Sequence, residues 1–261
     1  MRKKQSRKIL RSLLTELVLV TFLLILIAAG VKLYDAVKQG DSGLVAVADG
    51  GQKENGEIPK ELLALAEENP EIKDFVMSYP QKKDKEFEID LSEYKDCDEV
   101  PLFLQWDERW GYSYYGDNVM GISGCGPTCL SMVCVYLLGD VDLHPRYVAE
   151  FSEEKGYYVS GSGSSWSLIF EGGKELGLDV TEITPDEDRV MRNLELGNPI
   201  ICSMRPGDFT STGHFVVLVG CEDGKIKIND PNSMIRSEQL WNFEDIKYQI
   251  KNLWVCRKGE N

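Results

Sequence analysis

The longest uninterrupted apolar stretch of the chain lies close to its N-terminus. Residues 17–31 contain no charged side chain, and Leu13 and Leu14 extend the stretch if Glu16 lies at a membrane interface. A helix needs about 20 predominantly apolar residues to cross a bilayer. Because basic residues precede this stretch, the pattern predicts a membrane anchor within residues 1–38, with the N-terminus in the cytoplasm.

A cleaved signal peptide is the main alternative to an anchor, and a buried soluble helix is a third interpretation. A signal peptide has a shorter apolar region, which is followed by small residues at the cleavage site. Residues 28–30 are small, but no clear cleavage motif stands at the required place. We therefore favour a single-pass protein of the cell membrane over a secreted one. Both interpretations place residues 40–261 outside the cytoplasm.

Residues 39–95 combine a polar linker with a short amphipathic segment. Residues 39–57 are rich in glycine and polar side chains, which is typical of a flexible linker. Leucines at helical spacing follow, and Pro70 then separates two short helical pieces. We interpret residues 58–90 as a stalk or as a strap packed on the next domain. A pro-segment that occupies an active-site cleft is the alternative.

The pattern changes to that of a compact domain over residues 96–261. A long apolar helix is predicted after Cys125 and ends at Gly139, and two further helices are predicted over 165–177 and 186–197. Apolar runs then predict strands over 199–204, 214–220, 225–229 and 253–257. Because helices come first and strands follow, the domain is expected to be α+β rather than doubly wound.

Composition supports a folded domain and argues against a nucleic-acid partner. Hydrophobic residues make up 43% of the 261 residues, which is enough for a sizeable core. The net charge is −14, and residues 1–38 carry eight Lys and Arg against two acidic residues. The body of the chain is therefore strongly acidic, and it lacks the basic surface that displaces phosphate counterions from nucleic acids.

Cys125 lies at the start of the long apolar helix. Pro127 fits the first helical turn, where its missing N–H costs nothing, and Gly139 is a normal residue at a helix end. Free N–H groups and the positive end of the helix dipole stabilise a thiolate, which is the nucleophilic form of cysteine. Most cysteines in such turns are small core residues, so Cys125 becomes a catalytic candidate only together with a base.

The chain has two histidines, and they differ in their surroundings. His144 precedes Pro145 in a polar stretch, which indicates an exposed or helix-capping residue. His214 opens the apolar strand predicted over 214–220. A ring at the mouth of a buried strand is held rigidly, as a general base must be. His214 is therefore the candidate base.

The turn after this strand decides whether Asp230 can reach His214. A three-residue loop over 222–224 would place Val216 opposite Asp230, so that Asp230 becomes a diagonal neighbour of His214. A two-residue loop would shift the pairing by one residue and send Asp230 to the other face of the sheet. The apolar pattern does not decide between the two registers.

Four segments, in this order, resemble the motifs of the C39-like family of cysteine peptidases. The segments are 100–111 (VPLFLQWDERWG), 124–128 (GCGPT), 213–218 (GHFVVL) and 229–231 (NDP). The resemblance extends over about residues 98–258. Four motifs with compatible order and spacing are a far more specific signal than one alone.

The resemblance implies a papain-like α+β fold, with the nucleophile at the start of a buried helix packed on an antiparallel sheet. It also implies hydrolysis of peptide or protein substrates through an acyl-enzyme. Cys125 would attack, His214 would shuttle the proton and Asp230 would orient the imidazole. The side chain of Gln105 and the backbone N–H of Cys125 would form the oxyanion hole. The resemblance implies no metal and no organic cofactor.

Two other functions stay open. An amidase or endopeptidase directed at peptidoglycan stem peptides would use the same Cys/His chemistry, and a non-catalytic peptide-binding module would keep only the fold. The six cysteines besides Cys125 have no spacing that fixes a disulfide pattern, and Cys129 and Cys134 are interpreted as core residues of the apolar helix.

Two loops are candidates for the rim of a substrate cleft. Residues 205–212 lead directly to His214 and are expected to line the rim and to shape specificity. Residues 160–165 are rich in serine and glycine, and we interpret them as a flexible loop that caps the helix beginning near Trp166. A border of the cleft is the alternative for this second loop.

Overall fold

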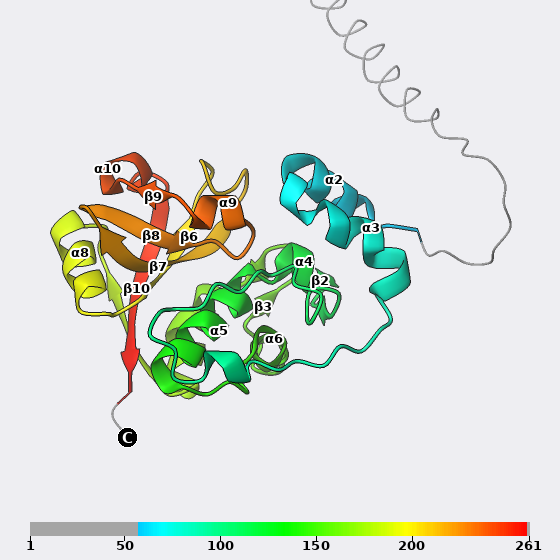
Figure 1. Ribbon diagram of the computed structural model, residues 1–261, viewed down its shortest axis with the longest axis horizontal. Helices are drawn as coiled ribbons and strands as arrows, with labels where there is room; N and C mark the ends of the chain where they lie inside the picture. Colours follow the sequence, from blue (N-terminus) through cyan, green and yellow to red (C-terminus); the bar gives the residue numbers. More distant parts are fainter. Residues whose placement is uncertain (1–56, 260–261) are drawn as a thin grey trace, which may run out of the picture. The chain divides into compact units, whose positions relative to one another are not determined.

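The computed structural model describes residues 57–259, which Figure 1 shows as coloured ribbons. The anchor or signal peptide predicted within residues 1–38, and the linker up to residue 56, lie outside the described residues. No helix over 57–259 is both long and apolar enough to cross a membrane. All described residues belong to one compact unit.

A six-stranded antiparallel sheet forms one half of this unit, with the strand order β5-β10-β6-β7-β8-β9. Its strands are β5 (Leu178–Ile183), β6 (Ile200–Met204), β7 (His214–Glu222), β8 (Lys225–Asn229), β9 (Leu240–Trp241) and β10 (Ile250–Lys258). The strands predicted over 199–204, 214–220, 225–229 and 253–257 are confirmed. The sequence pattern did not reveal β5 and β9, because β5 buries only two of its residues and β9 is two residues long.

Helices cover both faces of the central strands. Helix α5 (Cys125–Leu138) shares one core cluster with Phe215 and Val217 of β7. Helix α8 (Glu187–Glu195) shares a second cluster with the alternate residues Val216 and Leu218. Figure 1 shows the two helices on either side of the strands. The fold is therefore α+β with an antiparallel sheet, as predicted.

The predicted helix boundaries are largely confirmed. Helix α5 ends at Gly139, whose φ of 68° is left-handed, and Asp186 caps α8 by accepting from the N–H of Arg189. The helix expected over 165–177 is irregular, because it runs through the π-helical turn η3 (Leu168–Gly172) into α7 (Gly173–Glu175). At Gly173 a Cβ would approach Val180 to 3.0 Å, so glycine permits this close packing on β5.

The remaining elements are short and lie mainly in the helical half and in the connections. They are α2 (Lys60–Glu68), η1 (Pro70–Ile72), α3 (Lys73–Lys82), η2 (Ser92–Tyr94), β1 (Tyr114–Tyr115), β2 (Asn118–Val119), α4 (Met120–Ser123), α6 (Pro145–Glu154), β3 (Tyr158–Val159), β4 (Gly163–Ser164), α9 (Met234–Ser237) and α10 (Phe243–Ile246). His144 caps α6 through Nδ1, which accepts from the N–H of Tyr147 at 3.0 Å. The capping interpretation of His144 is therefore confirmed.

The segment that carries α2 and α3 packs on the domain. Its apolar residues form a core cluster together with Tyr112 and Val119. The rings of Phe75 and Tyr112 stack with their centroids 4.1 Å apart, and the Tyr112 hydroxyl donates to the Phe75 carbonyl at 2.9 Å. Over its described part the segment is a strap, which we define as residues 57–95, rather than a free stalk.

Candidate active site

Cys125 is the first residue of α5, directly after the short helix α4. The turn between the two helices is tight, because the N–H of Gly124 donates to the Met120 carbonyl at 2.8 Å. A Cβ on Gly124 would lie 2.6 Å from that carbonyl oxygen, and one on Gly126 would collide with the side chain of Ser164. The two glycines therefore allow the backbone to pack closely around Cys125, whose own side chain remains partly exposed.

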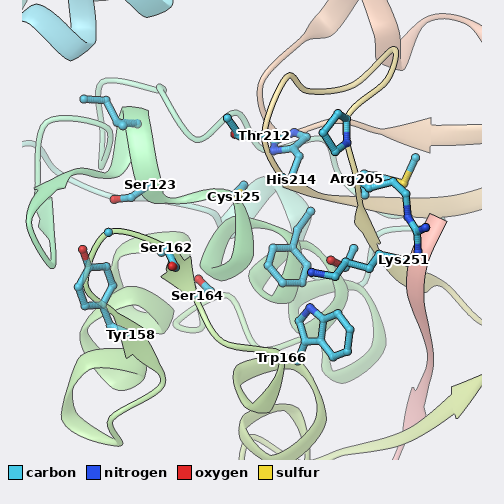
Figure 2. A pocket seen from close by; sticks show the side chains of 18 of the residues that line it. Ser123, Cys125, Tyr158, Ser162, Ser164, Trp166, Arg205, Thr212, His214 and Lys251 are labelled. Atoms are coloured by element: carbon cyan, nitrogen blue, oxygen red, sulfur yellow. The ribbon is translucent and has the colours of Figure 1, made fainter. Parts of the chain in front are cut away.

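His214 is the first residue of β7, and it lies next to Cys125 at the start of α5. It pairs with Met204 of β6, and the residue is only 8% exposed. The His214 Nε2 atom lies 2.7 Å from Oδ1 of Asp230, which leaves Nδ1 for the thiol side. Figure 2 shows Cys125 and His214 next to each other in one pocket.

The register that brings Asp230 to His214 arises in a way that the sequence did not predict. The β7–β8 turn has two residues, Asp223 and Gly224, with φ of 51° and 73°, so of the two loops that the sequence left open the shorter one is present. A bulge between Leu218 and Gly220 then inserts Val219 as an extra residue. Beyond the bulge the pairing is the one that a three-residue loop would have produced, and Asp230 reaches His214.

Asp230 is completely buried and holds two cationic partners. Besides His214, it accepts from Arg236 Nε at 2.6 Å on Oδ2 and from the N–H of Asn232 at 2.8 Å on Oδ1. Burial raises the pKa of the Asp230 carboxyl, but the charges and hydrogen bonds of His214 and Arg236 outweigh it and lower this pKa. Asp230 is therefore held as a carboxylate.

The imidazole of His214 is stabilised in its charged form. Burial alone lowers the pKa of His214, but the charge and hydrogen bond of Asp230, together with those of Cys125, raise it to about 10. The imidazole thus lies beside a carboxylate on one side and a thiol on the other, which is the arrangement in which a base serves a nucleophile.

Gln105 is nearly buried, with 3% of its surface exposed. Its Nε2 donates to the carbonyls of Gly121 and Ile122 at 2.9 and 3.3 Å. Its backbone N–H donates to the Pro231 carbonyl at 2.7 Å, beside Asp230. Gln105 thus links the loop of Asp230 to the turn before Cys125, and the oxyanion role remains a prediction.

A cavity of about 910 Å³ opens at Cys125 and His214. Residues from both candidate rim loops line it, including Ser162 and Ser164 on one side and Arg205 and Thr212 on the other. Residues 205–212 therefore line the rim as expected, while their role in specificity stays a prediction. Residues 160–165 border the cleft, which was the less favoured interpretation. No residue of the strap lines this cavity, so the described geometry does not support a pro-segment in the cleft.

The strap instead contacts the loop that carries Asp230. The carboxylate of Glu71 accepts from the backbone N–H groups of Met234 and Ile235 at 2.8 and 3.2 Å, and from the hydroxyl of Ser233. Asn69 donates to the Asn232 carbonyl at 2.6 Å. The sequence pattern did not predict this contact or the ion pair of Arg236 with Asp230. Both depend on residues that only the folded chain brings together, and no local pattern indicates them.

The cysteines outside the site lie mainly in the core. Cys129 and Cys134 are completely buried on α5, as interpreted from the sequence. All seven cysteines lie within residues 57–259 and are unpaired.

Comparisons with known proteins find a matching family and several similar solved structures. A family model described as "Peptidase_C39 like family" matches residues 97–260. Among solved structures, the chain is similar to the peptidase domain of Streptococcus ComA, a bi-functional ABC transporter involved in quorum sensing. The identity is 19% and the TM-score 0.43, over 62% of this chain and 99% of that chain.

Two further solved structures are similar at comparable levels. One is described as a C39-like peptidase from Bacillus anthracis, with 15% identity and a TM-score of 0.40, over 66% of this chain and 98% of that chain. The other is a double glycine motif protease from an AMS/PCAT transporter, with 19% identity and a TM-score of 0.39, over 61% of this chain and 91% of that chain. No curated protein matches the chain.

Proposed function

Because this chain belongs to the Peptidase_C39 like family, we propose that it hydrolyses peptide bonds as a cysteine peptidase with Cys125 as nucleophile. The observation that carries the proposal is the buried pair of His214 and Asp230, joined at 2.7 Å beside the cysteine at the start of α5. A buried histidine without a catalytic task needs only a backbone partner, whereas this one lies between a carboxylate and a thiol.

The proposed reaction proceeds through an acyl-enzyme. The Cys125 thiolate attacks the scissile carbonyl carbon, and the imidazolium of His214 gives its proton to the leaving amine. Water, from which His214 now takes a proton, then hydrolyses the thioester and releases the acid. Asp230 accepts from Nε2 throughout, so that Nδ1 stays directed at the reacting atoms.

The oxyanion of the tetrahedral intermediate needs donors close to Cys125. The N–H of Cys125 is among the first four N–H groups of α5, which have no partner within the helix. We propose the side chain of Gln105 as the second donor. Of its two hydrogen bonds, the longer one, to the Ile122 carbonyl at 3.3 Å, is the one that an oxyanion would replace.

Alkylation of the full-length chain tests this proposal. Iodoacetamide is applied at graded pH, and the modified cysteines are mapped by mass spectrometry, with the partly exposed Cys97 and Cys221 as internal references. We expect Cys125 to react faster than both references, because His214 lies beside it as a base. His214→Ala should abolish this reactivity, whereas His144→Ala, which removes a helix cap, should preserve it.

Cleavage of peptides then identifies the class of hydrolase. Wild-type protein is incubated with a proteome-derived peptide library and, separately, with purified peptidoglycan. Cleavage of linear peptides supports the peptidase, and release of stem-peptide fragments alone would replace it with the peptidoglycan-directed enzyme. Ordinary reactivity of Cys125, equal to that of Cys221 and unchanged in His214→Ala, would instead favour the non-catalytic module.

We also propose that residues 1–38 anchor the chain in the cell membrane and that residues 40–261 face the exterior. The support is the apolar stretch 17–31 and the basic flank before it. Extraction of membranes with alkaline carbonate should leave the full-length chain in the pellet, and protease added to intact cells should remove its C-terminal part. A soluble product that begins near residue 30 would show that the segment is a cleaved signal peptide.

A further inference from the structure

The cavity around Cys125 differs in charge from the rest of the molecule. The chain as a whole carries a net charge of −14. Apart from His214, the charged side chains that line the cavity are Arg205 and Lys251, and no Asp or Glu of residues 57–259 is among the lining residues. The substrate cleft of an acidic protein is thus bordered by positive charge alone.

The backbone determines the positions of Arg205 and Lys251. Arg205 follows the last residue of β6, and its N–H donates to the Gln249 carbonyl at 2.8 Å. Lys251 is the extra residue of a bulge in β10, because Ile250 pairs with Met204 and Asn252 pairs with Ser203. A bulge re-aims a side chain, and here it leaves Lys251 in the cavity wall.

Neither cation is neutralised by a partner. No salt bridge to Arg205 or Lys251 occurs within the part of the chain that the structure describes. Asp208 is the acidic residue of the loop 205–212. It accepts from Gln249 Nε2 at 2.6 Å and does not line the cavity. Both cations therefore remain available to a ligand.

An aromatic side chain completes the same wall. Trp166 is 42% exposed, and its ring lies edge-to-face against the buried Trp254 at 5.6 Å. The ammonium of Lys251 lies 5.1 Å from the centroid of the Trp166 ring, which holds it over the aromatic face. Figure 2 shows Arg205, Lys251 and Trp166 on one side of Cys125, with Tyr158 on the other.

We propose that Arg205, Lys251 and Trp166 form a subsite for an acidic side chain of the peptide substrate, next to the scissile bond. A guanidinium binds a carboxylate through two parallel hydrogen bonds, and a cleft lined by one sign of charge concentrates ligands of the opposite sign. Trp166 offers the apolar surface for the methylene groups of the same side chain. This inference rests on the proposed function in one respect, namely that the peptide bound at the subsite is a substrate.

The charge of the cleft can be measured without turnover. Rates of alkylation at Cys125 are compared for iodoacetate, which is an anion, and for neutral iodoacetamide of nearly equal size. In the full-length chain, R205E/K251E should lower the ratio of the iodoacetate rate to the iodoacetamide rate about fivefold or more. The matched control R189E/K225E changes the net charge equally on exposed residues of α8 and β8 that do not line the cavity.

A fall in the ratio that is equally large in the control, or no fall in either variant, overturns the inference. Because this reagent pair reports charge near the thiol, it responds even if Cys125 has no catalytic role. Failure of the inference and failure of the proposed function are therefore distinguishable. Failure of the proposed function is detected by the pH dependence of Cys125 labelling in wild type and His214→Ala.

Protection by peptides identifies the ligand. Two pools of octapeptides, acetylated and amidated so that neither end is charged, carry one Glu or one Lys among random uncharged positions. The Glu pool should halve the rate of iodoacetamide labelling of Cys125 at a concentration about fivefold lower than the Lys pool does. The R205E/K251E variant should reverse this order, and equal protection by both pools overturns the inference.

Discussion

The two sides of the candidate site are built in different ways. On the cysteine side, the positions of Gly124, Cys125 and Gly126 follow from one tight turn and the helix that it begins. On the histidine side, His214 begins β7 and Asp230 follows the end of β8. Arg236 holds Asp230, and Glu71 of the strap holds the residues that follow it.

This difference has consequences for stability and function. The cysteine side depends on local backbone geometry and on an apolar helix, so substitutions there should act separately on chemistry or on folding. The histidine side depends on sheet register, on buried charge and on Glu71 of the strap, which lies 163 positions before its partner Met234. Changes on this side should alter the pKa of His214 and the fold of the loop together.

Removal of the sulfur should have the largest effect. Cys125→Ala should lower peptide hydrolysis on the order of 10⁴-fold or more, because no other group supplies the nucleophile. Its melting temperature should stay close to that of the wild type, since Cys125 is partly exposed. The matched variant Cys129→Ala lies on the same helix but is completely buried. It should retain hydrolysis and lose roughly 1 kcal/mol of unfolding free energy.

Neutralisation of Asp230 should have the next largest effect. Asp230→Asn removes the charge that raises the pKa of His214, and hydrolysis should fall roughly 10³-fold. The folded-state pKa of His214, about 10, lies above its ordinary value. The charged ring therefore stabilises the fold fully below about pH 6.5, and this contribution is lost as the pH rises through about 10.

Denaturant unfolding at neutral and at alkaline pH measures this contribution of the charged His214 ring to the free energy of unfolding. The stability gap between wild type and Asp230→Asn should be wide at pH 6 to 7 and narrow at a pH of about 10.5. The alkaline limb of the pH–rate profile should move to lower pH in the variant. The exposed Asp142→Asn serves as the control. A gap that stays constant with pH would mean that Asp230 does not act through the charge of His214.

The contact from the strap should have a moderate effect. Glu71→Gln weakens the hydrogen bonds to Ser233, Met234 and Ile235, which lead into the turn that carries Arg236. We expect kcat to fall about fivefold with KM little changed, and stability to fall by about 1 kcal/mol. Glu68→Gln, on the exposed surface of the same strap, should change neither. If both variants behave alike, the strap does not position the site.

The cysteine side was the easier half to predict. On that side, the end of α5 follows from Gly139, which adopts a left-handed conformation without strain. On the histidine side, Gly224 gives the same signal for the β7–β8 turn. The bulge at Val219 left no such signal, because residues 214–218 of β7 are buried on both faces and show no period-two pattern. Arg236 and Glu71 were missed for a related reason, since their partners are distant in sequence and only the folded chain brings them together.

The smallest effect is expected from a hydroxyl on the cysteine side. Thr128 is completely buried on α5, and its Oγ1 has no hydrogen-bond partner within residues 57–259. Thr128→Val keeps the shape and removes an unsatisfied polar group, so stability should rise by about 1 kcal/mol and the melting temperature by about 2–4 °C. Hydrolysis should stay within about twofold of wild type, because the change does not alter the charge around His214.

Ser131 provides the contrast on the same helix. Its hydroxyl donates to the Leu143 carbonyl at 2.6 Å in the core. Ser131→Ala should therefore lower stability by about 1–3 kcal/mol, because a buried carbonyl loses its donor, while hydrolysis again stays near the wild-type level. Thermal melts of both variants, with hydrolysis measured in parallel, check the pair. A large loss of hydrolysis in either variant would show that the cysteine side, too, couples folding to chemistry.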